Sequence, residues 1–388
     1  MELVNWQSVL TEHQVHTLSA LQRLPGVTLT VVVGREELPE RKSQGWTKPD
    51  WGHLNVVLLD HASWFRAGTA VIRAHPNAVH LFNGLWADRR IFLLLLYALW
   101  RRRKIGLVTE PYSDTVDGYL SDQHKAKGWV LSQVRSFIYG VAGKLLGKKI
   151  GPVFAISPKA VRQFEKVGFP ARNIYPFGYF VPAHPYGAAD RKMGLDGELR
   201  LVFVGALIAR KGVDVLFQMA SFCREKNIPI RLDIYGPGES DLPFPELPNM
   251  HYCGVIPFGQ AQELIARYDV LIVPSRYDGW GVVVNEALQQ GVPVLASSNA
   301  GASALVSQSG AGAVFDPGNM PGLVELIESL ANDRTIIVGW KKKAWAYAGK
   351  LAPEIAASYM LECIEANLSG TGKPPCPWYS MDEDATFN

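Results

Sequence analysis

This 388-residue chain contains the stretch Val273-Pro-Ser-Arg-Tyr-Asp-Gly-Trp-Gly-Val-Val-Val-Asn-Glu-Ala-Leu-Gln-Gln-Gly-Val-Pro-Val-Leu295, which predicts a strand, a tight turn, a helix and a second strand. An apolar run ends at Pro274, glycines mark the turn, and the helix begins near Gly281. A helix N-terminus presents N–H groups and a positive dipole end to an anion. Asp278 in the turn and Glu286 in the helix add carboxylates that can accept hydroxyl protons. The stretch therefore predicts a site for a nucleotide sugar, which combines a diphosphate with ribose and sugar hydroxyls.

Strand-like and helix-like segments alternate along the whole chain, which favours parallel sheets covered by helices. The predicted strands are 27–33, 54–60, 78–83, 104–110 and 153–157 in the first half, and 199–206, 231–235, 250–255, 270–274, 292–296 and 313–315 in the second. The expected class is α/β, with two Rossmann-like domains facing each other across a cleft. Ligands of such sheets bind at the carboxyl ends of the strands.

The length of the chain exceeds that of one ordinary core, so two domains are expected. The predicted parts are an N-terminal domain (1–183), a linker (184–197), a C-terminal domain (198–352), a helix that returns to the N-terminal domain (353–370) and a disordered tail (371–388).

The composition is that of a globular enzyme, because 48% of the residues are hydrophobic and 19% are charged. The four cysteines have neither paired nor metal-ligand spacing, so no disulfide framework and no zinc site are expected. The first residues lack the basic start and apolar run of a signal peptide. The expected compartment is the cytoplasm.

Positive charge is concentrated in the first half. Residues 1–190 carry 23 Lys and Arg against 14 Asp and Glu, whereas the rest carries 16 against 22. One half is therefore expected to face something anionic. Two interpretations of segments 89–104 and 144–149 stay open: a buried helix with a basic end, or docking on the anionic inner face of a plasma membrane. Without a nucleic-acid-binding motif, nucleic acid is not an expected partner.

Three segments of the second half carry the candidate chemistry. Phe203-Val-Gly-Ala-Leu-Ile-Ala-Arg-Lys-Gly212 is a strand, a glycine turn and two cations, and Asp233-Ile-Tyr-Gly-Pro-Gly-Glu239 is a strand and a second glycine turn. Together with the stretch from Val273 to Leu295, their order resembles the family-4 retaining glycosyltransferases of GT-B fold, over about residues 199–318. The resemblance implies transfer of a sugar from a nucleotide donor with retention at the anomeric carbon, and without a metal or other cofactor.

The resemblance also implies residue roles. Glu286 is expected to hold the ribose hydroxyls, Asp278 to contact hydroxyls of the donor sugar, and Lys211 to bind phosphate. N–H groups from Gly279 to Val282 are expected to bind the distal phosphate. Backbone near Gly254 to Pro257, which includes Val255, is expected to bind the base. The full set of donor-binding candidates is Gly205, Arg210, Lys211, Gly236, Gly238, Val255, Asp278, Gly279, Trp280, Gly281, Val282 and Glu286.

The sequence departs from the family pattern at two places. Ala206 stands where an arginine is frequent, and the turn from Asn299 to Leu305 lacks the usual glutamate. These departures leave open a non-catalytic partner subunit with the same fold. A nucleotide-sugar 2-epimerase is a second alternative, because such enzymes share the two-domain architecture.

Two residues of the first half are further catalytic candidates. His13 follows the first strand at the start of a helix, and Glu110 lies at the end of the strand 104–110. Either can face an acceptor, or be an ordinary surface residue and a turn cap. The function that the sequence favours is a retaining hexosyltransferase of surface polysaccharide, exopolysaccharide or lipopolysaccharide biosynthesis. Its expected donor is a UDP-sugar, with a GDP-sugar next, and its expected acceptor a glycan or polyprenyl-linked saccharide.

Overall fold

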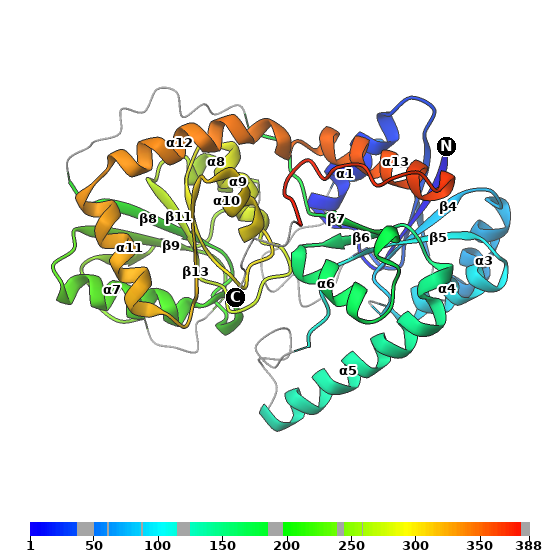
Figure 1. The fold of residues 1–388 in the computed structure, drawn as a ribbon, viewed down its shortest axis with the longest axis horizontal. Helices are drawn as coiled ribbons and strands as arrows, with labels where there is room; N and C mark the ends of the chain where they lie inside the picture. Colours follow the sequence, from blue (N-terminus) through cyan, green and yellow to red (C-terminus); the bar gives the residue numbers. More distant parts are fainter. Residues whose placement is uncertain are drawn as a thin grey trace.

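The computed structural model describes residues 1–36, 50–59, 62–86, 88–114, 125–184, 197–238, 244–257 and 259–381. Within them the chain forms two parallel sheets, each in its own lobe (Figure 1). Most of the expected linker, residues 185–196, lies outside the described residues, as do residues 382–388 of the expected tail.

The first lobe is built on a sheet with the strand order β3-β2-β1-β4-β5-β6-β7. Its elements are β1 (Glu2–Gln7), α1 (Glu12–Arg23), β2 (Thr28–Val33), β3 (Val56–Leu58), α3 (Trp64–Ala74), β4 (Val79–Asn83), α4 (Arg89–Trp100), β5 (Lys104–Thr109), α5 (Lys125–Leu146), η1 (Gly147–Lys149), β6 (Val153–Ile156), α6 (Pro158–Lys166), η2 (Ala171–Asn173) and β7 (Ile174–Phe177). Strand β7, which contains Pro176, was not among the predicted strands. At the edge of a sheet a proline is tolerated, since no neighbouring strand needs its missing N–H.

The second lobe repeats this plan with the order β10-β9-β8-β11-β12-β13. Its elements are β8 (Leu199–Val204), η4 (Ala209–Lys211), α7 (Val213–Glu225), β9 (Ile230–Tyr235), β10 (Met250–Tyr252), α8 (Ala261–Ile265), β11 (Val270–Val273), α9 (Val282–Gln289), β12 (Val294–Ser297), α10 (Ser303–Ser309), β13 (Gly312–Phe315), α11 (Met320–Asn332), α12 (Thr335–Ala348) and η5 (Gly349–Leu351). The stretch quoted first thus forms β11, α9 and β12, as its pattern predicts.

The last helix, α13 (Pro353–Ser369), leaves the second lobe and packs against α1 of the first (Figure 1). Ala356, Ala357 and Met360 of α13 belong to the same buried apolar cluster as Val15 and Leu18 of α1. The expected return of this helix to the N-terminal domain is confirmed.

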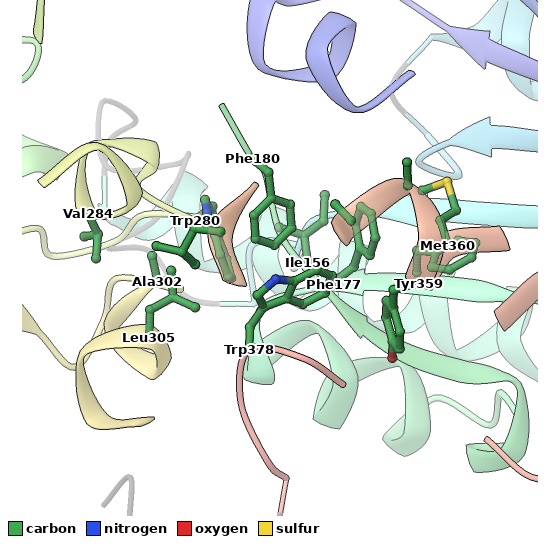
Figure 2. Packing of buried hydrophobic residues seen from close by; sticks show 14 of the residues in the cluster. Ile156, Phe177, Phe180, Trp280, Val284, Ala302, Leu305, Tyr359, Met360 and Trp378 are labelled. Atoms are coloured by element: carbon green, nitrogen blue, oxygen red, sulfur yellow. The ribbon is translucent and has the colours of Figure 1, made fainter. Parts of the chain in front are cut away.

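Residues 371–381 correct the expectation of a disordered tail. Trp378 is fully buried and Tyr379 is 3% exposed. The indole of Trp378 packs against Phe180 of the first lobe (Figure 2), with ring centroids 4.3 Å apart. Its N–H donates to the Lys350 carbonyl at 2.7 Å. The polar and proline-rich composition suggested disorder, but two aromatic side chains supply enough apolar surface to anchor the segment.

Both sheets change direction of strand order at one place, between β1 and β4 in the first and between β8 and β11 in the second. Ligands of open parallel sheets bind outside the carboxyl ends of the strands at such points. The loop after β8 carries Lys211, and the loop after β11 carries Asp278. In the first lobe the loop after β1 leads to His13.

Candidate active site

The loops after β8 and β11 are joined by their backbones. The N–H groups of Arg276 and Tyr277 both donate to the carbonyl of Arg210, at 2.9 and 3.3 Å. This contact brings Lys211 beside Asp278, and the Lys211 Nζ donates to the Asp278 Oδ2 at 2.5 Å. The two candidates that lie 67 positions apart in the sequence therefore form an ion pair, with side chains 22% and 11% exposed.

Gly212 makes this approach of the two loops sterically feasible. Its φ of +74° lies in the left-handed region, and a Cβ at this position would lie 2.1 Å from the Pro274 carbonyl oxygen. A side chain would therefore force the turn after Lys211 away from β11. The two residues of this Lys-Gly motif thus have different roles. Lys211 supplies the cation, and Gly212 allows the close approach that places it beside Asp278.

The surroundings of Asp278 favour its charged form. Burial alone would raise the pKa of this carboxyl, but the charge and hydrogen bond of Lys211 outweigh it and hold the pKa below its usual 3.8. The charge of Arg210 and the N–H of Trp280 act in the same direction. Asp278 is thus a carboxylate near neutral pH and can accept protons from hydroxyl groups.

Glu286 lies on α9, one helix turn past the loop 279–282 that leads into it. Its side chain is half-buried, and burial raises the pKa of the carboxyl to about 7. Burial is the one cause of this shift, and no charge or hydrogen bond of a described residue contributes to it. Within the described residues, the Glu286 carboxyl is thus left to accept hydrogen bonds from a ligand.

The glycine turns after β8 and β9 pack tightly on each other. A Cβ on Gly236 would lie 1.7 Å from the Gly205 carbonyl oxygen, and Gly238 has a φ of +112°. The loop after β10 joins them, because the N–H of Gly236 donates to the Gly254 carbonyl at 3.0 Å. The next residue, Val255, is 58% exposed. The structure therefore gathers the predicted turn residues at the carboxyl ends of neighbouring strands.

Trp280 differs from its expected place in a donor site. Its indole is 2% exposed and packs on Phe180 of the first lobe, with the N–H bound to Asn285 Oδ1 at 2.9 Å (Figure 2). It lies so close to Gly178 that a Cβ there would meet the ring at 2.4 Å. Only the backbone of Trp280 takes part in the Asp278 site, and the side chain joins the two lobes.

The first lobe contains a cavity of about 520 Å³ at the carboxyl ends of its strands. Both first-half candidates line it. The Tyr179 hydroxyl donates to the Glu110 Oε1 at 2.8 Å, and the Tyr179 ring lies 4.4 Å from the ring of His13. His13 Nε2 also lies 3.0 Å from the Thr11 Oγ1. His13 and Glu110 therefore lie on the same cavity wall, and both contact Tyr179.

Sequence reasoning missed Tyr179, which follows the unpredicted strand β7, and three other polar or aromatic residues of the cavity wall, Trp86, Tyr112 and Arg135. The signal for Tyr179 is its place two residues after a strand of a parallel sheet, and this signal was lost because β7 was not predicted.

No group of three or more His, Cys, Asp or Glu side chains in the described part of the chain is arranged to hold a metal ion. None of its helices combines the length and apolar character that crossing a membrane demands. Metal independence itself stays a prediction.

Sequence comparison places the second lobe among known proteins. Residues 198–333 match the model of the family described as Glycosyl transferases group 1. Alpha-D-kanosaminyltransferase of Streptomyces kanamyceticus is 22% identical over 240 residues, which are 58% of this chain and 60% of the relative. D-inositol 3-phosphate glycosyltransferase of Corynebacterium urealyticum is 28% identical over 189 residues, 45% of each chain. The chain thus spans only about half the length of these relatives.

Solved structures resemble the whole chain. HepE of Anabaena, solved in complex with UDP and glucose, superposes with a TM-score of 0.65 at 14% identity, covering 94% of this chain and 99% of HepE. Sucrose-phosphate synthase of Thermosynechococcus elongatus gives 0.64 at 14% identity, covering 96% and 100%. WaaG, a glycosyltransferase involved in lipopolysaccharide biosynthesis, gives 0.54 at 16% identity, covering 92% and 99%. With its two parallel-sheet lobes, the chain has the GT-B fold.

Proposed function

Residues 198–333 belong to the group 1 glycosyltransferases, and from that premise we propose that this chain transfers a hexosyl group from a nucleotide sugar to a saccharide acceptor, with retention and without a metal. The observation that carries the proposal is the ion pair between Lys211 and Asp278, which lies where the strand order of the second sheet reverses. A cation and a carboxylate held together there match a donor with a diphosphate and a hydroxylated sugar.

Each charged group has a task in this proposal. Lys211 and Arg210 neutralise the diphosphate, on which negative charge develops as the bond from the anomeric carbon to the phosphate oxygen breaks. Asp278 orients hydroxyls of the sugar, and Glu286 accepts hydrogen bonds from the ribose hydroxyls. An acceptor oxygen bonds to the anomeric carbon on the face that the diphosphate leaves. The departing phosphate oxygen takes the proton of the acceptor hydroxyl, so the step needs no protein base.

The acceptor site in this proposal is the cavity of the first lobe. Aromatic faces of Trp86, Tyr112 and Tyr179 suit the apolar faces of sugar rings, and Glu110 can accept a hydrogen bond from an acceptor hydroxyl. Tyr277 connects this cavity to the donor side, since its hydroxyl donates to the Pro111 carbonyl in the cavity wall at 3.0 Å. Closure of the cleft between the two domains then excludes water that would otherwise hydrolyse the donor.

UDP is the favoured nucleotide, because HepE was solved with UDP and with UDP-glucose, and TarM of S. aureus with UDP. The favoured context is surface glycan synthesis, because WaaG is involved in lipopolysaccharide biosynthesis. The alternative is a partner subunit without turnover. It is supported by Ala206 and by the lack of a glutamate in the turn from Asn299 to Leu305.

Thermal shift with UDP, GDP and ADP tests the donor site, because specific binding raises the melting temperature by mass action. We expect UDP to stabilise the wild type and to lose most of this effect in Glu286→Ala. Glu325→Ala, which removes an exposed carboxyl on α11 of the same lobe, is the matched control and should retain the shift. Equal UDP shifts in both variants would refute the assignment of Glu286.

Turnover is tested with UDP-glucose and UDP-galactose and a panel of saccharide acceptors, by UDP release and product analysis. A transferase gives a new α-glycosidic bond only when acceptor is present. An epimerase instead changes the donor without acceptor, and a non-catalytic subunit binds UDP but releases none from either donor. Either of the last two outcomes would overturn the proposed activity.

A further inference from the structure

Helix α5 (Lys125–Leu146) exposes a continuous apolar stripe on its outer side. The stripe consists of Val130, Val134, Phe137, Val141 and Leu145, which are 41 to 72% exposed. Successive members are three or four positions apart, so all lie on one face of the helix. A soluble surface rarely leaves so many large apolar side chains in one row without a partner.

The charges around this stripe have one sign. From Lys125 to Lys149 the chain contains six basic residues and no acidic one. Lys127, Lys144, Lys148 and Lys149 are exposed, and Lys144 lies beside the stripe, next to Leu145. A helix with a bare apolar face and cationic flanks is the type that lies in the interface of an anionic bilayer.

Helix α4 (Arg89–Trp100) adds a second exposed apolar row, formed by Leu93, Leu96 and Trp100. Trp100 is 70% exposed, and the guanidinium of Arg101 lies 5.6 Å from the centre of its ring. Tryptophan beside arginine is a side-chain combination that favours the headgroup region of membranes. The opposite face of α4, with Ile91, Leu94, Leu95 and Ala98, is buried in the first lobe.

Segment 89–104 therefore has a buried side, as the first sequence alternative expects, and an exposed apolar side, on which the second alternative depends. In α5 the cations of segment 144–149 were predicted as a docking feature, whereas the apolar stripe was not. The stripe is the stronger argument for docking.

Charge argues against a second copy of this chain as the occupant. Two α5 helices packed stripe to stripe would bring Lys144 and its neighbours of one copy against those of the other, without an acidic residue in the helix to compensate. An anionic lipid surface provides the opposite charge and the apolar layer together.

The inner side of α5 lines the cavity of the first lobe. Arg135, Ile138 and Tyr139 belong to its wall, and the Tyr139 ring stacks on Tyr112 at 4.3 Å. One helix thus separates the cavity from the exposed stripe. A saccharide carried on a membrane lipid could reach the cavity past this helix without leaving the bilayer surface.

We propose that α5 docks this protein on an anionic lipid bilayer, with Phe137 and its stripe in the boundary between headgroups and acyl chains, so that the cavity opens toward a lipid-linked acceptor. The docking stands on the surface of α5 alone, whereas the acceptor rests on the proposed function.

Vesicle co-sedimentation of the full chain tests the docking without donor or acceptor. We expect binding to vesicles of phosphatidylcholine with 30 mol% phosphatidylglycerol, weaker binding to pure phosphatidylcholine, and a decrease as salt is raised. The double variant Phe137→Ser/Leu145→Ser should lose at least tenfold in vesicle affinity. Phe222→Ser, which changes an exposed aromatic residue on α7 of the other lobe, is the control and should bind as the wild type does.

Three results would overturn the docking: a wild type that ignores anionic vesicles, equal binding by the double variant, or a wild-type dimer that the double variant converts to a monomer in sedimentation velocity without lipid. Because UDP thermal shifts of the same proteins report the donor site separately, failure of docking and failure of the proposed function are distinguishable. The double variant must keep the wild-type UDP shift, which also shows that it is folded.

Discussion

The Tyr277 hydroxyl donates a 3.0 Å hydrogen bond to the Pro111 carbonyl, and this bond ties the loop that carries Asp278 to the loop that carries Glu110. Tyr277 is 3% exposed. Burial raises the pKa of its phenol above the ordinary 10, so the group stays protonated and remains a donor across the neutral range. The two candidate sites are therefore linked by this buried hydrogen bond between the lobes.

Tyr277→Phe removes this hydrogen bond and keeps the ring. The unpaired, buried Pro111 carbonyl should lower the free energy of unfolding by about 1–3 kcal/mol. Because the two loops lose their alignment, kcat/KM should fall by about tenfold. Denaturant unfolding and steady-state kinetics measure the two effects. Tyr97→Phe, on α4 away from both sites, is the control. Unchanged kcat/KM in Tyr277→Phe would show that the link has no part in turnover.

The pair Lys211–Asp278 lends itself to a double-mutant cycle. Lys211→Met leaves the Asp278 carboxylate without its nearest cation, and should lower the free energy of unfolding by about 2 kcal/mol, less than the 3–5 kcal/mol typical of fully buried pairs. Asp278→Asn is expected to have a similar effect by leaving the ammonium unpaired. The double variant should recover most of the stability, since no lone charge remains.

Activity should respond differently to the same cycle. Each single variant is expected to lose at least about 10²-fold in kcat, and the double variant should recover none of it, because phosphate and hydroxyl contacts are both gone. An ion pair that is only structural would instead give a double variant with restored activity. Circular dichroism thermal melts and UDP release under saturating donor separate these outcomes.

The position of this pair could largely be predicted from the sequence, whereas the cavity of the first lobe could not. Lys211 and Asp278 each follow a predictable buried strand, and the order of a parallel sheet brings the ends of β8 and β11 together. The group of His13, Glu110 and Tyr179 depends instead on a long-range contact to the end of β7, an edge strand that was not predicted.

The role of the Trp280 side chain escaped sequence reasoning for a related reason. Inside a ligand-binding motif an aromatic residue suggests stacking on a base or sugar, but its indole is buried by Phe180 and Gly178, which lie a hundred positions earlier. The apolar stripe of α5 could have been predicted, because the sequence from Val130 to Leu145 has apolar residues three and four positions apart. What the sequence could not reveal is that nothing among the described residues covers it.

Glu286 gives a pH dependence of defined sign. The folded protein holds the proton of this carboxyl up to a pKa of about 7, whereas an unfolded chain releases it near 4.5. Protonation therefore favours the folded state, and the benefit disappears as pH rises from about 4.5 through 7. Glu286→Gln, which stays neutral, should match the wild-type melting temperature near pH 4.5 and exceed it at pH 8.

The same titration should govern donor binding, because the Glu286 carboxylate accepts hydrogen bonds from the ribose hydroxyls. UDP affinity of the wild type should rise between pH 6 and 8, and that of Glu286→Gln should be weak at both. Isothermal titration calorimetry at the two pH values measures it. A wild-type affinity that is flat over this interval would exclude Glu286 as the titrating ribose contact.

Trp378 offers a direct test of the tail. Trp378→Ala removes a fully buried indole that packs against Phe180 and, edge to face, against Tyr359, with ring centroids 4.3 and 5.1 Å away. The same indole donates to the Lys350 carbonyl. Truncation of a large buried aromatic residue costs about 3–5 kcal/mol. We expect a loss of that size in denaturant unfolding, whereas Trp100→Ala, at a 70% exposed tryptophan, should change stability by less than about 0.5 kcal/mol. Because Phe180 also carries the Trp280 indole, the loss of Trp378 should loosen the donor loop and weaken UDP binding as well. A tail that is disordered in solution would give the same small effect for both substitutions.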